Sequence, residues 1–305
     1  MGTATGTRGG ERETPASVGP SAPEGARSAA EPRPREEWSS RDANGLGFHL
    51  REIWKFRELM WTLSLRSLKS RYSQTLLGAS WAILQPLLLT GVFTLVFARF
   101  AKVDTGGAPY PVFAYAAMLP WQLFSNIITK GTSSVVENGA IVKKIYLPRE
   151  ICPLSALLVS LVDFAVAALP LVIFMVIFRV PPSILLVFLP VLLLIEVLFS
   201  LGIILFLSAI GVFYRDVGFA LPLILQVGMF LCPVAYALSS VPPEYLRWYL
   251  LNPLTPLVDG FRRIVVYQQM PQWDYVAYAA GVALVVLWLG YAYFKRSEGR
   301  FADVL

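Results

Sequence analysis

Six long stretches of the chain hold almost no charged side chain. They cover residues 72–98, 105–129, 151–178, 180–214, 217–243 and 275–294, and Asp163 and Glu196 are their only charged residues. A helix needs about 20 apolar residues to cross the hydrocarbon core of a bilayer, and each stretch can supply them. Because backbone polar groups cannot stay unpaired in lipid, these stretches must be helical. The sequence therefore predicts an all-α integral membrane protein with six transmembrane helices per chain.

Composition and charge placement agree with this class. Only 15% of the residues are charged, against roughly 25% in soluble domains. Lys and Arg are more frequent at the span ends on the side of the N-terminus, which predicts that both termini are cytoplasmic. The net charge of +6 therefore reflects membrane topology, and we expect no nucleic-acid partner. The expected spans are about 76–98, 109–132, 152–178, 183–213, 217–239 and 273–294.

The chain before the first span has two parts. Residues 1–45 are rich in Gly, Pro, Ala, Ser, Arg and Glu, which predicts a disordered cytoplasmic tail without a signal peptide. Residues 46–71 have the spacing of an amphipathic interface helix, whose basic wedge lies between two apolar flanks, one with Trp54 and Trp61 and one with Leu59 and Leu63. This helix is either a simple anchor or also a contact for a cytoplasmic partner. Its interface residues are Trp54, Arg57, Trp61, Arg66, Lys69 and Arg71.

The segment 130–153 lies on the cytoplasmic side in this topology and is too short for a domain. It contains a turn signal at Asn138-Gly139, a short apolar and basic stretch, and Pro148 before the third span. It is either an ordinary positively charged loop or a short helix, at about 137–147, that contacts a soluble subunit.

The segment 241–274 is apolar and aromatic, but prolines divide it into pieces that are too short to span. We expect two re-entrant half-helices, at about 244–251 and 256–268, that dip into the outer leaflet and return. A plain interfacial loop is the alternative. Tyr and Trp side chains here suit the membrane interface, and the basic side chains can reach headgroups or anionic cargo: Arg247, Arg262 and Arg263.

Two carboxylates, Asp163 and Glu196, fall in the middle of expected spans. An acid inside the membrane is costly and is a functional candidate by default. It can serve a proton or cation relay, as in a secondary transporter, or have a structural or pore-lining role. We expect no intramembrane base beside them, since the nearest candidate, Lys130, lies toward a span end.

Signals of enzymatic chemistry are missing from the sequence. His49 is the only histidine and lies before the first span, and Cys152 and Cys232 lack metal-ligand spacing. The chain has no Gly-Lys dipeptide, so it cannot hold a nucleotide-binding loop of the G-x-x-x-x-G-K-[ST] type. We expect no metal and no cofactor on this chain, and any nucleotide must be bound by another one.

Several short motifs follow one another in a recognisable order. They are RSLKSRYSQTLLG at 66–78, ASWAILQP at 79–86, LPW at 119–121, LPRE at 147–150, YRD at 214–216, CPV at 232–234 and NP at 252–253. This order across six spans resembles the permease subunit of polysaccharide-exporting ABC transporters, the family that exports O-antigen, capsule and teichoic acid. The resemblance covers residues 48–301, so residues 72–301 are expected to form the permease domain.

The resemblance implies a homodimer in the cytoplasmic membrane of a bacterium, surrounded by membrane lipids. Two copies of a separate ABC ATPase subunit would bind ATP and Mg, and the cargo would be a lipid-linked glycan. The segment at 137–147 would be the coupling helix that docks into the ATPase, with Glu137, Asn138, Lys143, Lys144, Tyr146, Arg149 and Glu150. The first and fifth spans would line a channel through Trp81, Gln85, Phe93, Phe97, Gln226, Phe230 and Tyr236. The half-helices would form an outer gate with Tyr245, Trp248, Asn252, Pro253, Arg262, Arg263 and Tyr267.

Three alternatives stay open at this point. A drug or lipid exporter of the same superfamily would share the coupling helix, although such exporters usually lack the broken aromatic outer segment. An ion-coupled secondary transporter would use Asp163 and Glu196. A membrane-embedded scaffold would fit the tail but gives the half-helices no role.

Overall fold

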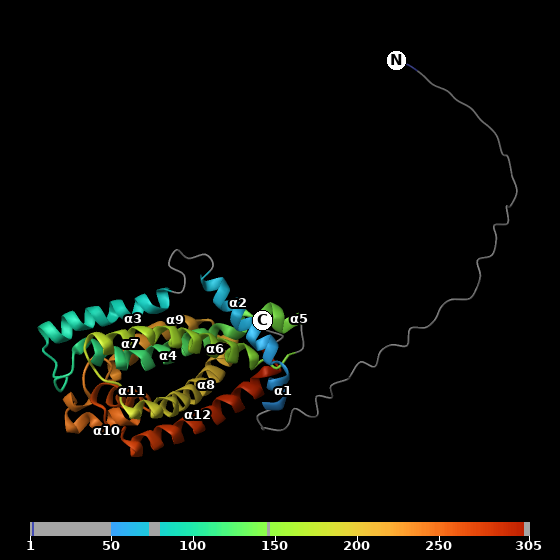
Figure 1. Ribbon diagram of the computed structural model, residues 1–305. Coiled ribbons are helices and arrows are strands. Elements are labelled where there is room, and N and C mark those ends of the chain that lie inside the picture. The colour runs from blue at the N-terminus through green and yellow to red at the C-terminus, as the bar shows by residue number, and fades with distance from the viewer. Residues whose placement is uncertain (1, 3–49, 73–79, 145–146, 302–305) are drawn as a thin grey trace. The chain divides into compact units, whose positions relative to one another are not determined.

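The computed structural model describes residues 2, 50–72, 80–144 and 147–301, and all regular structure in these ranges is helical. Residues 46–305 form one compact unit, whereas the predicted tail belongs to a separate unit that, except for Gly2, lies outside the described residues. The α-helices (Figure 1) are α1 Leu50–Lys55, α2 Arg57–Tyr72, α3 Ser80–Phe93, α4 Tyr110–Glu137, α5 Gly139–Lys144, α6 Ile151–Ala167, α7 Leu169–Ile177, α8 Leu189–Phe213, α9 Asp216–Leu231, α10 Pro243–Leu251, α11 Leu254–Arg262 and α12 Trp273–Glu298. The π-helices η2 Thr94–Phe100 and η5 Arg263–Tyr267 continue α3 and α11, and the 3-10 turns are η3 Ile184–Phe188 and η4 Leu238–Ser240.

Within the described ranges, four helical segments are long and apolar enough to cross a membrane. They are Ser80–Phe100, Ile151–Ile177, Ile184–Phe213 and Trp273–Glu298, and they correspond to the first, third, fourth and sixth expected spans. The segment Ile151–Ile177 is interrupted at Ala168, between α6 and α7, where Pro170 has no backbone N–H to donate to the preceding turn. The two remaining expected spans, the second and the fifth, need separate explanations.

The second expected span is α4, which is 28 residues long and forms the centre of the bundle. It packs against α3, α6, α8, α9 and α11, and residues 112–118 are completely buried. A helix that is covered by other helices does not need a lipid-facing apolar surface, so it can carry Lys130 and many small polar residues. Its composition is therefore less apolar than that of the four spans above.

The fifth expected span, at 217–239, is shorter than predicted. The helix α9 has 16 residues and ends at Leu231, because Cys232 before Pro233 adopts an extended conformation. At 1.5 Å per residue, such a helix is roughly 24 Å long, less than the ~30 Å thickness of the hydrocarbon core. Residues 232–242 continue as irregular chain and the turn η4 up to α10.

The helices α8 and α12 pack with their backbones in direct contact. A Cβ atom at Gly290 would lie 2.0 Å from the carbonyl oxygen of Gly202, and a Cβ atom at Gly202 would lie 2.5 Å from the backbone nitrogen of Leu287. Small residues allow helix backbones to approach this closely, which is a common packing mode in membranes. The buried residues Ala279, Ala283 and Gly290 lie on one face of α12, and this spacing is the sequence signal for the contact.

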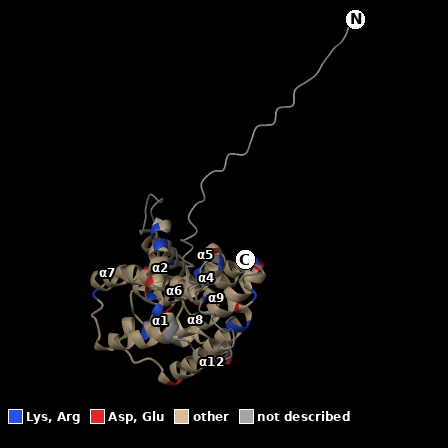
Figure 2. Cartoon of the chain, turned by 90° about the vertical axis from the view of Figure 1, so that its right-hand side faces the viewer, with Lys and Arg blue, Asp and Glu red and all other residues tan. Residues whose placement is uncertain are grey.

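Two ends of this bundle matter for function. At one end lie α1, α2, α5 and the last turn of α12, which we call the α5 end (Figure 1). The half-helices α10 and α11 lie at the other end, which we call the α10 end (Figure 1). Figure 2 looks onto the α5 end and shows Lys and Arg on α2 and around α5.

Candidate functional site

The α5 end presents a short helix in the place where the sequence predicts a coupling helix. The helix α4 ends at Glu137, and the Asn138 side chain donates a hydrogen bond of 2.8 Å from Nδ2 to the carbonyl oxygen of Ser134. The next helix, α5, buries Val142 in a cluster with α8 and α12, whereas Glu137 and Lys143 are exposed. Of the other predicted coupling residues, Tyr146 and the side chain of Lys144 lie outside what the structure describes.

Two of the predicted coupling residues turn toward their own chain. Glu150 is only 2% exposed, and its Oε1 atom lies 2.5 Å from Nζ of Lys295 near the end of α12. Lys295 also pairs with Glu298 at 2.9 Å, and the guanidinium of Arg149 stacks over the ring of Phe301 at 5.5 Å. The Glu150–Lys295 ion pair thus joins the start of α6 to the end of α12 at the α5 end. The sequence analysis missed Lys295 because it lies 145 positions after Glu150.

The predicted interface helix is divided into α1 and α2, and its two apolar flanks have different surroundings. Leu63 is buried against Leu147 and Ile151, and the Ser64 hydroxyl lies 3.2 Å from the carbonyl oxygen of Ser155 on α6. The opposite flank is left uncovered, with Trp54 70% and Trp61 54% exposed. The basic residues Arg57, Arg66 and Lys69 are exposed as well, and the side chain of Arg71 lies outside the described residues. One flank therefore binds the bundle, and the other can enter lipid.

The two acids inside the spans have different environments. Asp163 on α6 forms a buried ion pair with Lys130 on α4, so the prediction that no base accompanies the acids is wrong for Asp163. Glu196 on α8 is 1% exposed, and within the described residues neither of its carboxyl oxygens has a hydrogen-bond partner. The Lys130–Asp163 pair joins two neighbouring helices of the core, which is the position of a structural contact.

Removing one charge of this pair should destabilise the protein. We expect Asp163→Asn to lower the free energy of unfolding by about 3–5 kcal/mol, because the Lys130 ammonium loses its buried counter-charge. The double variant Lys130→Met/Asp163→Leu should recover most of that loss. Thermal unfolding of the purified protein in detergent measures both. If the double variant folds normally but transports nothing, the Lys130–Asp163 pair has a role in transport beyond stability.

The residues predicted to line a channel fall into two groups. Trp81 and Gln85 on α3, and Gln226 and Phe230 on α9, are exposed on the single chain. Phe93 is buried in the core, where it packs edge-to-face on Phe97 with ring centroids 5.5 Å apart. Tyr236 is partly buried, and its hydroxyl donates to the Phe230 carbonyl oxygen at 2.8 Å and lies 3.0 Å from the Tyr249 hydroxyl. The four exposed side chains are the ones that can face a channel.

Arg262 holds the irregular chain after α9 in place. Its guanidinium donates hydrogen bonds to the carbonyl oxygens of Pro233 at 2.6 Å, Val234 at 2.8 Å and Tyr236 at 2.9 Å. It also lies 3.9 Å above the ring of Phe113 on α4. The side chain is 0% exposed, so the expectation that Arg262 reaches headgroups or cargo is wrong.

The other predicted gate residues lie around α10 and α11. Tyr245 and Trp248 on α10 are exposed at 57% and 73%, whereas Pro253 is buried. Oδ1 of Asn252 accepts a hydrogen bond from the Leu254 backbone amide at 3.1 Å, at the start of α11. Three further contacts complete the α10 end: Arg263 Nε to Asp259 Oδ2 at 3.0 Å, Arg263 Nη1 to the Met270 carbonyl oxygen at 3.3 Å, and the Tyr267 hydroxyl to the Thr105 carbonyl oxygen at 2.9 Å.

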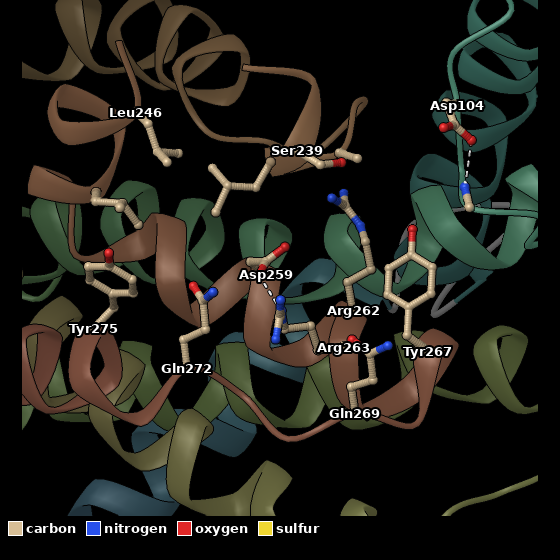
Figure 3. Close-up of a pocket in the computed structure, with 14 residues that line it drawn as sticks. Asp104, Ser239, Leu246, Asp259, Arg262, Arg263, Tyr267, Gln269, Gln272 and Tyr275 are labelled. Atoms are coloured by element: carbon tan, nitrogen blue, oxygen red, sulfur yellow. Dashed lines mark hydrogen bonds and ion pairs between the residues drawn. The ribbon is translucent and has the colours of Figure 1, made fainter. Parts of the chain in front are cut away.

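A cavity of about 480 Å³ opens at the α10 end (Figure 3). Its walls come from the loop after η2, from η4, from α10, from α11 with η5, and from the start of α12. Polar and aromatic side chains line it, among them Asp104, Ser239, Asp259, Arg263, Tyr267, Gln269, Gln272 and Tyr275. The sequence analysis did not predict this cavity, because its walls come from segments far apart in the chain.

This geometry defines a class of protein. It is a helical membrane protein that has an exposed short helix at one end and two half-helices at the other. The chain belongs to the ABC-2 type transporter membrane family, whose model matches residues 58–266. The match runs from Glu58 in α2 to Val266 in η5. It includes α2 and α5 of the α5 end and the cavity walls on α10 and α11.

Curated relatives cover most of the chain. It is 29% identical to the O-antigen export system permease protein RfbA of Myxococcus xanthus, over 83% of this chain and 98% of the relative. It is 27% identical to the protein of the same name from Klebsiella pneumoniae, over 81% of this chain and 95% of the relative. The polysialic acid transport protein KpsM of Escherichia coli is 28% identical, over 77% of this chain and 92% of the relative.

Proposed function

We propose that this chain is the permease subunit of an ATP-driven exporter that moves a lipid-linked polysaccharide of the O-antigen type across the cytoplasmic membrane. The observation that carries the proposal is the similarity to O-antigen export permeases, which extends over nearly the full length of those relatives. The described residues contain no group of three or more His, Cys, Asp or Glu side chains that could hold a metal ion. In this proposal a separate ATPase subunit supplies the energy.

The proposed topology has six crossings, with both termini in the cytoplasm. The four long apolar segments, the central α4 and the shorter α9 followed by residues 232–242 provide these crossings. The α5 end then faces the cytoplasm, in agreement with the Lys and Arg residues gathered there. The half-helices α10 and α11, nine residues each, are too short to span and would be re-entrant from the outer side.

The proposed mechanism begins at α5. Closure of two ATPase subunits around nucleotide would press on α5 in each permease of a homodimer. Because the Glu150–Lys295 ion pair fastens the start of α6 to the end of α12, a displacement of α5 would reach both helices. The channel would lie between α3 and α9 of the two permeases, lined by Trp81, Gln85, Gln226 and Phe230. Aromatic rings and amides suit a sliding sugar chain.

Substitution of the exposed α5-end charges tests the docking step. We expect Glu137→Ala/Lys143→Ala to reduce the amount of ATPase that co-purifies with the permease severalfold, because exposed ion pairs and hydrogen bonds at a docking surface are lost. The matched control is Arg99→Ala/Asp274→Ala, which removes one exposed base and one exposed acid elsewhere in the chain. If both double variants retain the same amount of ATPase, the assignment of α5 is wrong.

Two measurements separate the proposed exporter from the two alternative transporters: cargo uptake, and the surface polysaccharide of the cell. An ion-coupled carrier responds to a protonophore and ignores removal of the ATPase, whereas the proposed exporter stops when the ATPase is removed. A drug or lipid exporter also requires the ATPase, but its loss leaves the surface polysaccharide of the cell unchanged.

A further inference from the structure

We propose that the cavity at the α10 end is a binding site for a neutral, hydroxyl-rich sugar unit. The inference rests on the proposed function, because that function places the cavity on the outer side of the membrane and makes the cargo a glycan. At about 480 Å³ its volume falls in the range of roughly 300–1,000 Å³ that is typical of small-ligand sites.

The charges of the cavity argue against an anionic ligand such as a phosphate. Among the residues that the structure describes, four charged ones line it, and their charges balance: the acids Asp104 and Asp259 and the bases Arg262 and Arg263. Both bases already have partners, since Arg262 donates to three backbone carbonyl oxygens and Arg263 is bound to Asp259 and Met270. Neither guanidinium is therefore in a position to form the two-pronged contact that phosphate recognition uses.

Other polar groups of the cavity remain available to a ligand. Over the ranges of the chain that the structure describes, no hydrogen bond involves the side chains of Ser239, Gln269, Gln272 or Tyr275. Amides and hydroxyls both donate and accept, which is what a sugar hydroxyl requires from its neighbours. The rings of Tyr267 and Tyr275 also border the cavity (Figure 3), and aromatic rings pack against the CH-rich face of a sugar.

The position of the site gives it a role in export. Its walls include α10 and α11, the half-helices proposed to form the outer gate. They also include η4, which lies in the segment between α9 and α10 to which Arg262 is hydrogen-bonded. A sugar unit that occupies the cavity contacts the gate and the start of α12 at the same time. The site would therefore hold the emerging chain at the gate between two export steps and oppose its return.

A binding experiment with matched variants tests the site. The probe is a mixture of short oligosaccharides, released by mild acid from the surface glycolipid of the cells that make this chain and freed of lipid. Saturation-transfer difference NMR measures its binding to the permease with its ATPase in lipid nanodiscs. The test variant is Gln269→Ala/Gln272→Ala, whose two amides are exposed and make no hydrogen bond in the described chain.

The control is Gln268→Gly, which removes the neighbouring amide that points to Pro181 and not into the cavity. Glycine accepts the left-handed backbone of this position, where φ is 55°. We expect the dissociation constant to rise about tenfold in the test variant, through the loss of two hydrogen bonds, and to stay within about twofold in the control. Inorganic pyrophosphate should not displace the oligosaccharide.

Equal affinity of the test variant and the wild type would overturn the inference, as would the absence of any binding to the wild type or displacement by pyrophosphate. Deletion of the gene separates this failure from failure of the proposed function. If deletion removes the surface glycan but the cavity binds no sugar, only the sugar site is wrong. If deletion leaves the surface glycan unchanged, the proposed function itself fails.

Discussion

Replacing Gly290 by alanine should prevent α8 and α12 from packing as they do. The added Cβ atom would lie 2.0 Å from the carbonyl oxygen of Gly202 and 2.8 Å from its carbonyl carbon, and both are backbone atoms that no rotamer change can move. Overpacking of a core costs about 1–3 kcal/mol and occasionally more. For Gly290→Ala we expect a loss in the free energy of unfolding at the upper end of this range or beyond it, because the two helices must separate along the contact. The midpoint of thermal unfolding in detergent measures the loss.

A matched control lies on the same helix. Gly281 on α12 has open space where a Cβ atom would be placed, so Gly281→Ala should leave the unfolding midpoint unchanged or raise it slightly, through the better helix propensity of alanine. If Gly290→Ala and Gly281→Ala unfold at the same temperature, the close contact between α8 and α12 does not exist in the folded protein.

Replacing Arg262 by methionine should release the chain between α9 and α10. The substitution keeps much of the apolar stem but leaves the carbonyl oxygens of Pro233, Val234 and Tyr236 without their donor. Each buried carbonyl that loses its partner costs about 1–3 kcal/mol, so we expect a loss of several kcal/mol and exposure of this segment. Arg262→Lys should recover little, because one ammonium cannot reproduce the planar fork of a guanidinium.

Cysteine labelling reports this release directly. Cys232, next to Pro233, is completely buried, so a maleimide should leave it unmodified in the wild type and modify it in Arg262→Met. Cys152, which is also buried, is replaced by serine in every protein tested. The control is Arg263→Met, which removes the neighbouring guanidinium and its contacts with Asp259 and the Met270 carbonyl oxygen but no contact with residues 233–236, so Cys232 should stay unmodified. Labelling of Cys232 at the wild-type rate in Arg262→Met would contradict the role of Arg262.

The elements predicted well from sequence are those defined by local signals. Prolines and aromatic residues predict half-helices at about 244–251 and 256–268, and the structure has α10 at Pro243–Leu251 and α11 with η5 at Leu254–Tyr267. The turn signal at Asn138-Gly139 lies where α4 ends at Glu137 and α5 begins at Gly139, and of the two alternatives for this segment, a loop or a short helix, the structure has the short helix. Charge-free length predicts the four long apolar segments. In each of these cases the determining residues are neighbours in the chain.

What the sequence could not predict depends on contacts between distant residues. Arg262 and Arg263 are neighbours of the same residue type, but only Arg262 donates hydrogen bonds to the irregular segment that follows the end of α9 at Leu231. The Lys130–Asp163 pair and the burial of Phe93 likewise arise when α4 becomes the centre of the bundle. The cavity at the α10 end is a further case, because separate segments supply its polar groups.

Purification of the tagged permease from its native membranes, with mass spectrometry of everything that co-purifies, tests the central claim most directly. An ATP-driven polysaccharide exporter predicts one nucleotide-binding subunit for each permease and a bound lipid-linked glycan. The Glu137→Ala/Lys143→Ala protein, purified in parallel, should retain severalfold less of the subunit, whereas Arg99→Ala/Asp274→Ala should retain the wild-type amount. A homo-oligomer with neither an ATPase nor a glycolipid would contradict the claim and would favour an ion-coupled carrier in which Glu196 has a direct role.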